Sequence, residues 1–168
     1  MNKIVVYRIT AVLLVFLLQV LMCNRIALWG YATPFLVVYL FLKIPSGARL
    51  NIAMTFAFFV GLCIDIFTGT LGVYALASVT AVFPHHYLIN RVQYREREEE
   101  SFTPSAEILG WGGYTLYAAL ITAIFCVVLF CIDSFSFFAP AVLLGRIVGS
   151  TAFTLLIVLC IEIVSRRK

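Results

Sequence analysis

Apolar residues gather into six runs separated by short polar segments. The runs cover residues 4–23, 34–45, 49–67, 70–90, 108–132 and 140–164. A membrane-spanning helix needs about 20 predominantly apolar residues, and every run except the second is close to that length. The pattern therefore predicts an all-α integral membrane protein, with residues 1–168 forming a single bundle of six transmembrane helices.

The second run, between Pro34 and Pro45, is short for a span. Two interpretations stay open: a tilted helix that begins within residues 28–33, or a re-entrant element that leaves five spans. The positions of Lys and Arg favour six spans, because an excess of these residues in short loops marks the cytoplasmic side. With the N-terminus inside, the outer loops carry only Arg25. The cytoplasmic ends carry the other cations outside the membrane, namely Lys3, Arg8, Lys43, Arg49, Arg91, Arg95, Arg97, Arg166, Arg167 and Lys168.

Composition sharpens this picture. Charged residues make up 12% of the chain, about half of the ~25% typical of soluble domains, so any function must reside in the bundle or its loops. The apolar stretch 9–23 of the first run follows Lys3 and Arg8 as in a signal peptide, but no small-residue cleavage pattern follows, so we predict a retained signal anchor. The five cysteines lie in apolar runs without metal-ligand spacing, so we expect no disulfide, metal site or cofactor.

Asp65 is the costliest residue of the third run. An ionised Asp inside a bilayer costs roughly 2.5 to 3.5 kcal/mol on insertion scales, so it needs a partner. One candidate is Arg146, which lies six residues after Pro140 in the last run and at a matching depth. That pair could clamp helices together or contact a protein partner or a substrate. The alternative is a cap on the turn that contains Gly69 and Gly72.

Other polar or small residues give weaker signals. Gly145 and Gly149 have the small-xxx-small spacing of close helix contacts; we expect internal packing, with contact to another protein as the alternative. His85 and His86 point about 100° apart on a helix and cannot share a metal comfortably, so an interfacial position is favoured over a proton relay. Glu162 and Arg166 are spaced for a local ion pair.

The longest polar stretch, residues 91–107, is predicted to be a cytoplasmic loop. It is either a solvated connection or a docking surface for a cytoplasmic partner. No catalytic motif is present: the sequence lacks a G-x-S-x-G elbow, H-E-x-x-H, a phosphate-binding loop and paired carboxylates at mid-membrane depth. We therefore do not expect an enzyme.

The run GLCIDIFTGTLGVYA, residues 61–75, resembles the G-x-x-x-D-x-x-x-G-x-x-G signature of the bacterial rod shape-determining MreD family, in its Bacteroidota-type form. The segment LLQVLMCNRIALWGYATPFLVVYLFLKIP resembles that family's opening, and LLGRIVGSTAFTLLI its last helix. The likeness spans roughly residues 10 to 160. It places Gln19, Asn24, Gly30 and Pro34 in the opening motif, and Gly61, Asp65, Gly69 and Gly72 in the central one.

The resemblance implies a non-catalytic inner-membrane scaffold of the cell-elongation machinery, with a fold like the substrate-binding subunits of energy-coupling-factor transporters. The implied main partner is MreC; RodA, a class B penicillin-binding protein and MreB belong to the wider complex. It implies no small-molecule substrate, and nothing points to nucleic acid. The alternative is a vitamin-type transport subunit with an outer pocket, for which Trp29, Tyr31, Tyr74 and Trp111 are candidate lining residues.

Overall fold

The computed structural model describes residues 15, 17–19, 33–96, 103–133 and 140–166, and this part of the chain is helical without any strand. The helices are α2 (Val37–Leu42), α3 (Leu50–Thr68), α4 (Val73–Glu96), α5 (Gly110–Asp133) and α6 (Pro140–Arg166). The predicted all-α class is confirmed.

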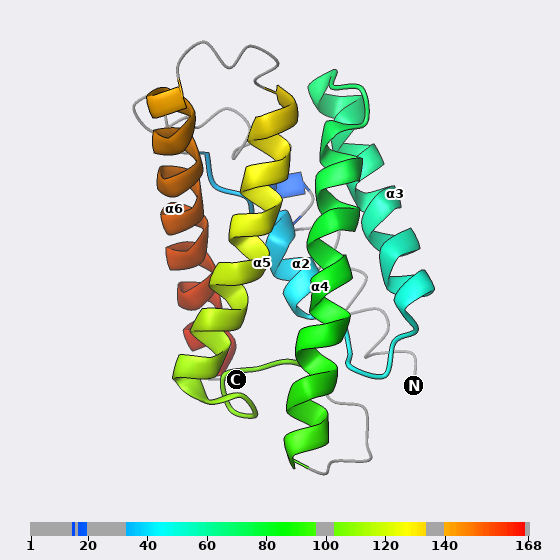
Figure 1. Ribbon diagram of the computed structural model, residues 1–168, viewed down its shortest axis with the longest axis vertical. Helices are drawn as coiled ribbons and strands as arrows, with labels where there is room; N and C mark the ends of the chain where they lie inside the picture. Colours follow the sequence, from blue (N-terminus) through cyan, green and yellow to red (C-terminus); the bar gives the residue numbers. More distant parts are fainter. Residues whose placement is uncertain (1–14, 16, 20–32, 97–102, 134–139, 167–168) are drawn as a thin grey trace.

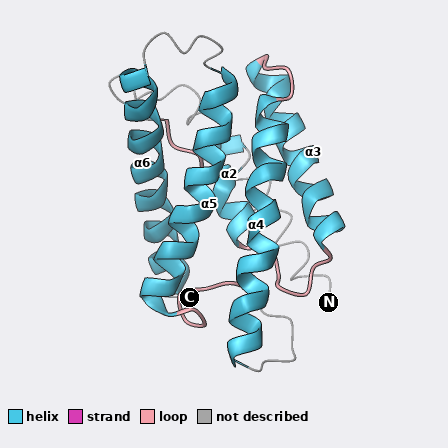
Figure 2. Cartoon of the chain, in the orientation of Figure 1, coloured by secondary structure: helices cyan, strands magenta, loops and turns pink. Residues whose placement is uncertain are grey.

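The four long helices lie side by side in the order α3, α4, α5, α6, each antiparallel to its neighbour, and α2 lies behind them against α4 and α5 (Figures 1 and 2). One end of the bundle holds the end of α3 and the start of α4, and we call it the Asp65 end. The opposite end holds the end of α6, and we call it the Glu162 end.

Within the residues that the structure describes, three helices are long and apolar enough to cross a membrane: Leu50–Thr68, Gly110–Asp133 and Val142–Val164. The stretch Val73–Ile89 is a shorter apolar helix. These helices match the last four predicted runs to within a few residues, and they indicate a membrane protein. The first run lies almost entirely outside the described residues, where only Val15 and residues 17–19 are seen, in helical conformation. The count of six spans therefore stays a prediction.

Helix α4 continues to Glu96, so the first six residues of the predicted loop 91–107 are helical. The last residues of that loop, from Thr103 onward, are not helical, and Pro104 and Ala106 among them are buried. The part of this segment that the structure describes is therefore partly helix and partly packed against the bundle, rather than a wholly solvated connection.

Helix α2 has only six residues, a rise of about 9 Å against a hydrocarbon layer of about 30 Å. Residues 33–35 before it are not helical, which excludes a continuous tilted helix beginning before Thr33. The cause is local: Pro34 lacks an N–H and disfavours helical geometry in the residue before it. The segment nevertheless lies in the centre of the bundle, since Phe35, Val38 and Phe41 are at most 1% exposed.

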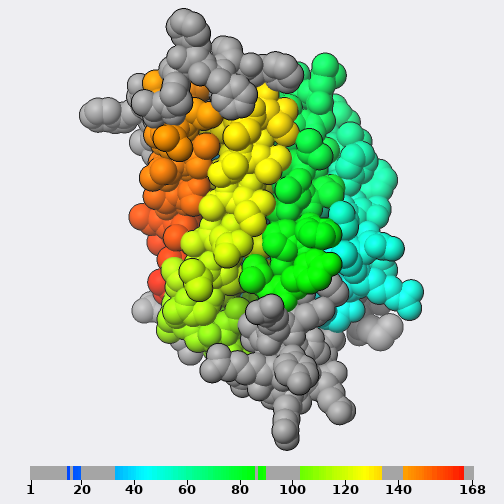
Figure 3. Space-filling view, viewed as in Figure 1, coloured from blue at the N-terminus to red at the C-terminus, as the bar shows by residue number. Residues whose placement is uncertain are grey.

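Aromatic side chains fill the space between this segment and α5. The Phe35 ring packs edge-on against Phe125 at a centroid separation of 5.3 Å and against Phe130 at 6.0 Å. Such pairs contribute about 0.5 to 1.5 kcal/mol each beyond area burial. The surfaces of α3 to α6 form one broad outer face (Figure 3). Large apolar side chains of these helices, such as Leu76, Leu116 and Leu156, are more than half exposed. This face suits lipid contact.

Candidate functional site

The Asp65 carboxylate caps the start of α4. Its Oδ1 accepts hydrogen bonds from the backbone N–H of Tyr74 at 3.0 Å and from the Thr70 hydroxyl at 2.5 Å. Its Oδ2 accepts one from the backbone N–H of Ala75 at 2.9 Å. Asp65 is only 3% exposed, so a buried charge is stabilised by three donors, two of them from the backbone.

The cap comes from another helix because the usual position for it is a glycine. Gly72 immediately precedes α4, and its carbonyl accepts the first helical hydrogen bond from Leu76. A residue at this N-cap position normally uses a side-chain oxygen to accept from the second or third N–H of the helix. Gly72 has no side chain, and Asp65 supplies the acceptor from α3 instead. Its negative charge also interacts favourably with the positive end of the α4 dipole.

Gly69 and Gly72 shape the turn between the two helices. Their φ angles are 71° and 78°, in the left-handed region that costs other residues roughly 1 to 2 kcal/mol. Gly69 closes α3 by donating its N–H to the Asp65 carbonyl oxygen, and Thr70 donates to the same oxygen at 3.1 Å. The two predicted motif glycines are therefore required by backbone geometry.

Gly61 lies one helical turn before Asp65 and brings α4 close to α3. A Cβ added at Gly61 would lie 2.6 Å from Ala75 Cα and 2.7 Å from the Tyr74 carbonyl oxygen. Both are backbone atoms that cannot rotate away. The glycines Gly61, Gly69 and Gly72, together with Asp65 and the first turn of α4, thus form one unit, which we call the Asp65 hairpin.

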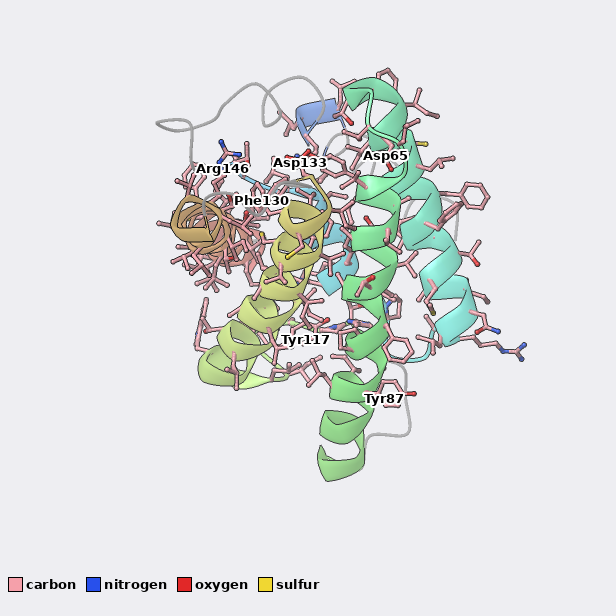
Figure 4. The ribbon with its side chains drawn as sticks, turned by 45° about the horizontal axis from the view of Figure 1, so that its top comes forward. Asp65, Tyr87, Tyr117, Phe130, Asp133 and Arg146 are labelled. Carbon is pink, nitrogen blue, oxygen red and sulfur yellow. The ribbon has the colours of Figure 1, made fainter. Side chains whose placement is uncertain are left out.

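The predicted pair between Asp65 and Arg146 is wrong. Both residues lie at the Asp65 end, as their matched depth predicted, but Arg146 is on α6 at the far side of α5 (Figure 4). In the part of the chain that the structure describes, the ion pair within 4.0 Å joins Lys43 and Glu162. The alternative interpretation, in which Asp65 caps the following turn, is the one that the hydrogen bonds support.

Gly145 does not pack internally, contrary to the expectation for the small-xxx-small spacing. It is exposed, and an added Cβ would meet nothing within 4 Å. Gly149 is partly buried. The close helix contact that was expected in α6 is instead found at Gly61 in α3.

Side chains satisfy the non-helical backbone before α2. The N–H of Thr33 donates to Ser150 Oγ at 3.1 Å, and the N–H of Phe35 donates to Thr154 Oγ1 at 3.0 Å. Gln19 donates to the Pro34 carbonyl oxygen at 3.4 Å. It also accepts from the Val37 N–H at 3.4 Å. Within a bilayer, backbone groups outside regular helices need such partners.

We call these contacts the α2 clamp: Gln19, Ser150 and Thr154 with the backbone of residues 33–37. Two residues of the opening motif belong to this clamp, because the Gln19 side chain donates a hydrogen bond to the Pro34 carbonyl oxygen. Asn24 and Gly30, from the same motif, lie outside the described residues.

A second buried charge, Glu162 on α6, lies at the opposite end of the bundle. Its Oε2 is 2.8 Å from Lys43 Nζ, just after α2, and accepts from the Tyr114 hydroxyl at 3.3 Å. Its Oε1 accepts from Lys43 at 3.0 Å and from the Ala106 N–H at 3.3 Å. Lys43 also donates to the Pro104 carbonyl oxygen at 3.2 Å. We call these residues the Glu162 network.

The Glu162 network joins α2, the 103–109 segment, α5 and α6. The sequence spacing predicts an ion pair between Glu162 and Arg166, but the structure pairs Glu162 with Lys43 instead. The side chain of Arg166 lies outside the described structure. Lys43 stands inside the second apolar run, and a cation in an apolar run was the available signal. Tyr114 and the serine and threonine of the α2 clamp gave no comparable signal, because such residues are common in membrane helices.

His85 lies inside the bundle, 3% exposed, and forms a hydrogen bond between its Nδ1 and the Tyr117 hydroxyl. The interfacial position expected for the two histidines stays a prediction, and the side chain of His86 lies outside the description. Tyr117 in turn contacts Tyr114 of the Glu162 network, with ring centroids 6.4 Å apart. The hydrogen bond thus ties α4 to α5 near that network.

The described aromatic candidates for a transport pocket are not gathered in one place. Tyr74 is the second residue of α4, at the Asp65 end, whereas Trp111 is the second residue of α5, at the Glu162 end. Tyr74 packs against Phe35 and Phe125 in the core. Trp29 and Tyr31 lie outside the described residues.

The chemistry available to the described residues is mainly structural. The two buried carboxylates, Asp65 and Glu162, lie at opposite ends of the bundle and cannot act on one reacting atom. Among the residues that the structure describes, no three His, Cys, Asp or Glu side chains are grouped to hold a metal ion. Comparison of the chain with family models, curated proteins and solved structures finds no match.

Proposed function

We propose that this chain is a non-catalytic scaffold in the bacterial inner membrane, of the MreD type, which binds MreC and helps to organise lateral peptidoglycan synthesis. The observation that carries the proposal is the Asp65 hairpin. The signature residues Gly61, Asp65, Gly69 and Gly72 act together in one structural unit. Two of the three hydrogen bonds to the carboxylate come from the first turn of α4, and the third comes from Thr70 in the connecting turn.

This use of Asp65 favours a scaffold over an enzyme or a proton carrier. A general base or a proton relay needs a group that is free to bind and release a proton, whereas Asp65 accepts from two backbone N–H groups that require an acceptor. A rigid bundle of helices with an apolar outer surface is suited to binding the membrane helix of a partner by close packing. MreC, a protein with a single membrane helix, is the partner that the resemblance implies.

The proposed orientation places the Glu162 end in the cytoplasm. Lys43 and Arg49 lie at that end, and Arg91 and Arg95 lie in the last turns of α4 beside it. At the Asp65 end the charges of the described residues are sparse. The positive-inside rule then assigns the Asp65 hairpin to the periplasmic side, and both termini to the cytoplasm in a six-span arrangement.

Co-purification tests the proposal. The tagged chain is expressed in its host at native level, extracted in a mild uncharged detergent and isolated at about 0.5 M salt, where the Debye length falls to a few ångströms and surface charge attraction is screened. We expect MreC to be the most enriched membrane protein by quantitative mass spectrometry, relative to an unrelated tagged multi-pass protein. Recovery of monodisperse chain with MreC at the level of the unrelated control contradicts the proposal.

A further inference from the structure

Residues 103–109, which we call the strap, lead into the start of α5. The strap runs across the Glu162 end of the bundle (Figure 2) and contains turns but no regular helix. Pro104 and Ala106 are buried, but the apolar hold on the strap is modest. Ala106 has a small side chain that buries little area, and Leu109 is only partly buried against the core. The polar contacts of the strap therefore matter for its position.

Two of the hydrogen bonds that fasten the strap end on the same ion pair. The N–H of Ala106 donates to Glu162 Oε1 at 3.3 Å. The Pro104 carbonyl oxygen accepts from Lys43 Nζ at 3.2 Å. Lys43 and Glu162 are paired with each other at 2.8 Å, so a change in either charge affects both fastening bonds. The strap and the ion pair thus form one cooperative unit.

A glycine in a left-handed conformation joins the strap to α5. Gly110 is exposed and has a φ angle of 70°. A Cβ added there would meet nothing within 4 Å, so the space beside this residue is open. Glycine adopts positive and negative φ about equally readily. A change of backbone conformation at Gly110 therefore moves the strap at little cost, and this residue has the properties of a hinge.

We propose that the strap is a latch, which opens and closes over the Lys43–Glu162 pair while the long helices stay folded. Segments with few buried apolar contacts open locally at a lower free energy than the whole fold. When the latch is closed, Ala106 covers part of the Glu162 carboxylate; when it is open, water reaches that oxygen. The strap follows the charged stretch 91–100 in sequence, so a protein that binds those charges would act on the ion pair through the strap. The latch does not depend on the proposed scaffold role.

Amide hydrogen exchange of the whole chain in an uncharged detergent tests the latch. The rates at Ala106 and at Ile121, in the middle of α5, are corrected for intrinsic exchange and followed in rising urea. We expect Ala106 to be protected but to exchange at least about tenfold faster than Ile121, with a weaker dependence on urea. Equal rates with equal urea dependence would mean that the strap opens only when the bundle unfolds. An unprotected Ala106 would mean that the strap is not closed. Either result overturns the proposal.

A pair of glycine variants tests the hinge without altering the ion pair. Gly110→Ala strains the closed latch, because alanine at a positive φ is unfavourable, and should speed exchange at Ala106 by about tenfold with Ile121 unchanged. Gly112→Ala is the matched control: its added Cβ also meets nothing within 4 Å, and its φ is not positive. It should behave like the wild type. Equal exchange at Ala106 in the two variants overturns the hinge and with it the proposal.

Glu162→Gln tests the fastening. This variant should speed exchange at Ala106 more than at Ile121, because the strap loses the charge on which its bonds depend. Arg49→Gln, an equal change in charge at the same end of the bundle, should leave both rates as in the wild type. An equal increase at Ala106 and Ile121 in Glu162→Gln would show that Glu162 holds the bundle as a whole rather than the strap, and would overturn the latch.

Discussion

Asp65 and Ala75 are joined side chain to backbone, with 2.9 Å between the carboxylate Oδ2 and the amide nitrogen. The contact is possible because Gly61, one turn earlier in α3, lets the backbone of α4 come close. A costly membrane carboxylate is thereby used to begin a helix whose own N-cap position, Gly72, has no side chain. The spacing of glycine and aspartate in this signature has a mechanical explanation.

Replacing Gly61 should separate the two helices. In Gly61→Ala the new Cβ would lie 2.6 Å from Ala75 Cα, and overpacking of this kind costs typically 1 to 3 kcal/mol. We expect a lower melting temperature in detergent and less folded protein in the membrane. Gly145→Ala is the matched control, because its Cβ meets nothing within 4 Å. An equal loss of stability in the two variants would contradict the close approach at Gly61.

Asp65 and Arg146 should act independently. Asp65→Asn should destabilise the hairpin because the amide group presents a donor toward one of two N–H groups that need an acceptor, an effect of about 1 to 3 kcal/mol. Arg146→Leu should neither add to nor relieve that loss. In a double-mutant cycle measured by thermal unfolding, we expect the effects to add within about 0.5 kcal/mol. Clear rescue of Arg146→Leu by Asp65→Asn would contradict this prediction and would indicate an ion pair between the two residues.

Breaking the Glu162 network should be more harmful than neutralising both partners. Removing one member of a fully buried ion pair costs about 3 to 5 kcal/mol, because the other charge stays buried and unpaired. The cost here should be smaller, since the Lys43 side chain is 25% exposed. We therefore expect Lys43→Met and Glu162→Gln each to destabilise the protein strongly, and the double variant to recover part of the loss. Arg49→Gln, at an exposed position near Lys43 in sequence, is the control and should be nearly neutral. A double variant as unstable as the sum of the singles would argue against the pair.

The α2 clamp should depend on the Thr154 hydroxyl. Thr154→Val keeps the shape of the side chain and leaves the Phe35 N–H without its acceptor, at a cost of about 1 to 3 kcal/mol. Thr55→Val is the control, since that hydroxyl bonds only to the Asn51 carbonyl oxygen of its own helix. We expect Thr154→Val to lower the melting temperature and to expose residues 33–37 to proteolysis, with little change in Thr55→Val. Equal behaviour of the two variants would mean that the Phe35 N–H finds another acceptor.

The sequence predicted the four long helices well, because their apolar runs are close to the length of a membrane span. It predicted the second run poorly. Pro34 and Pro45 pointed to irregular backbone, but the acceptors that make this backbone tolerable come from Ser150 and Thr154, more than a hundred residues away. No pattern in the local sequence predicts contacts between residues so far apart in the chain.

The candidate site was half predictable for a related reason. Asp65, Gly69 and Gly72 stand out because a buried charge and turn glycines are informative on their own. The partner of Asp65 depended on how helices approach each other, and matched depth alone suggested Arg146. The nearer donors, the N–H groups of Tyr74 and Ala75, carry no signature in the side-chain sequence because they belong to the backbone.

The central claim is that the Asp65 carboxylate holds the first turn of α4, and amide hydrogen exchange of that turn tests it most directly. The rates for Tyr74 and Ala75 are compared between the wild-type chain and Asp65→Ala, with the middle of α5 as the internal reference. The account predicts about tenfold or more faster exchange at these two amides, a loss of at least about 1.4 kcal/mol of local protection, with the reference unchanged. Unchanged exchange at Tyr74 and Ala75 would contradict it.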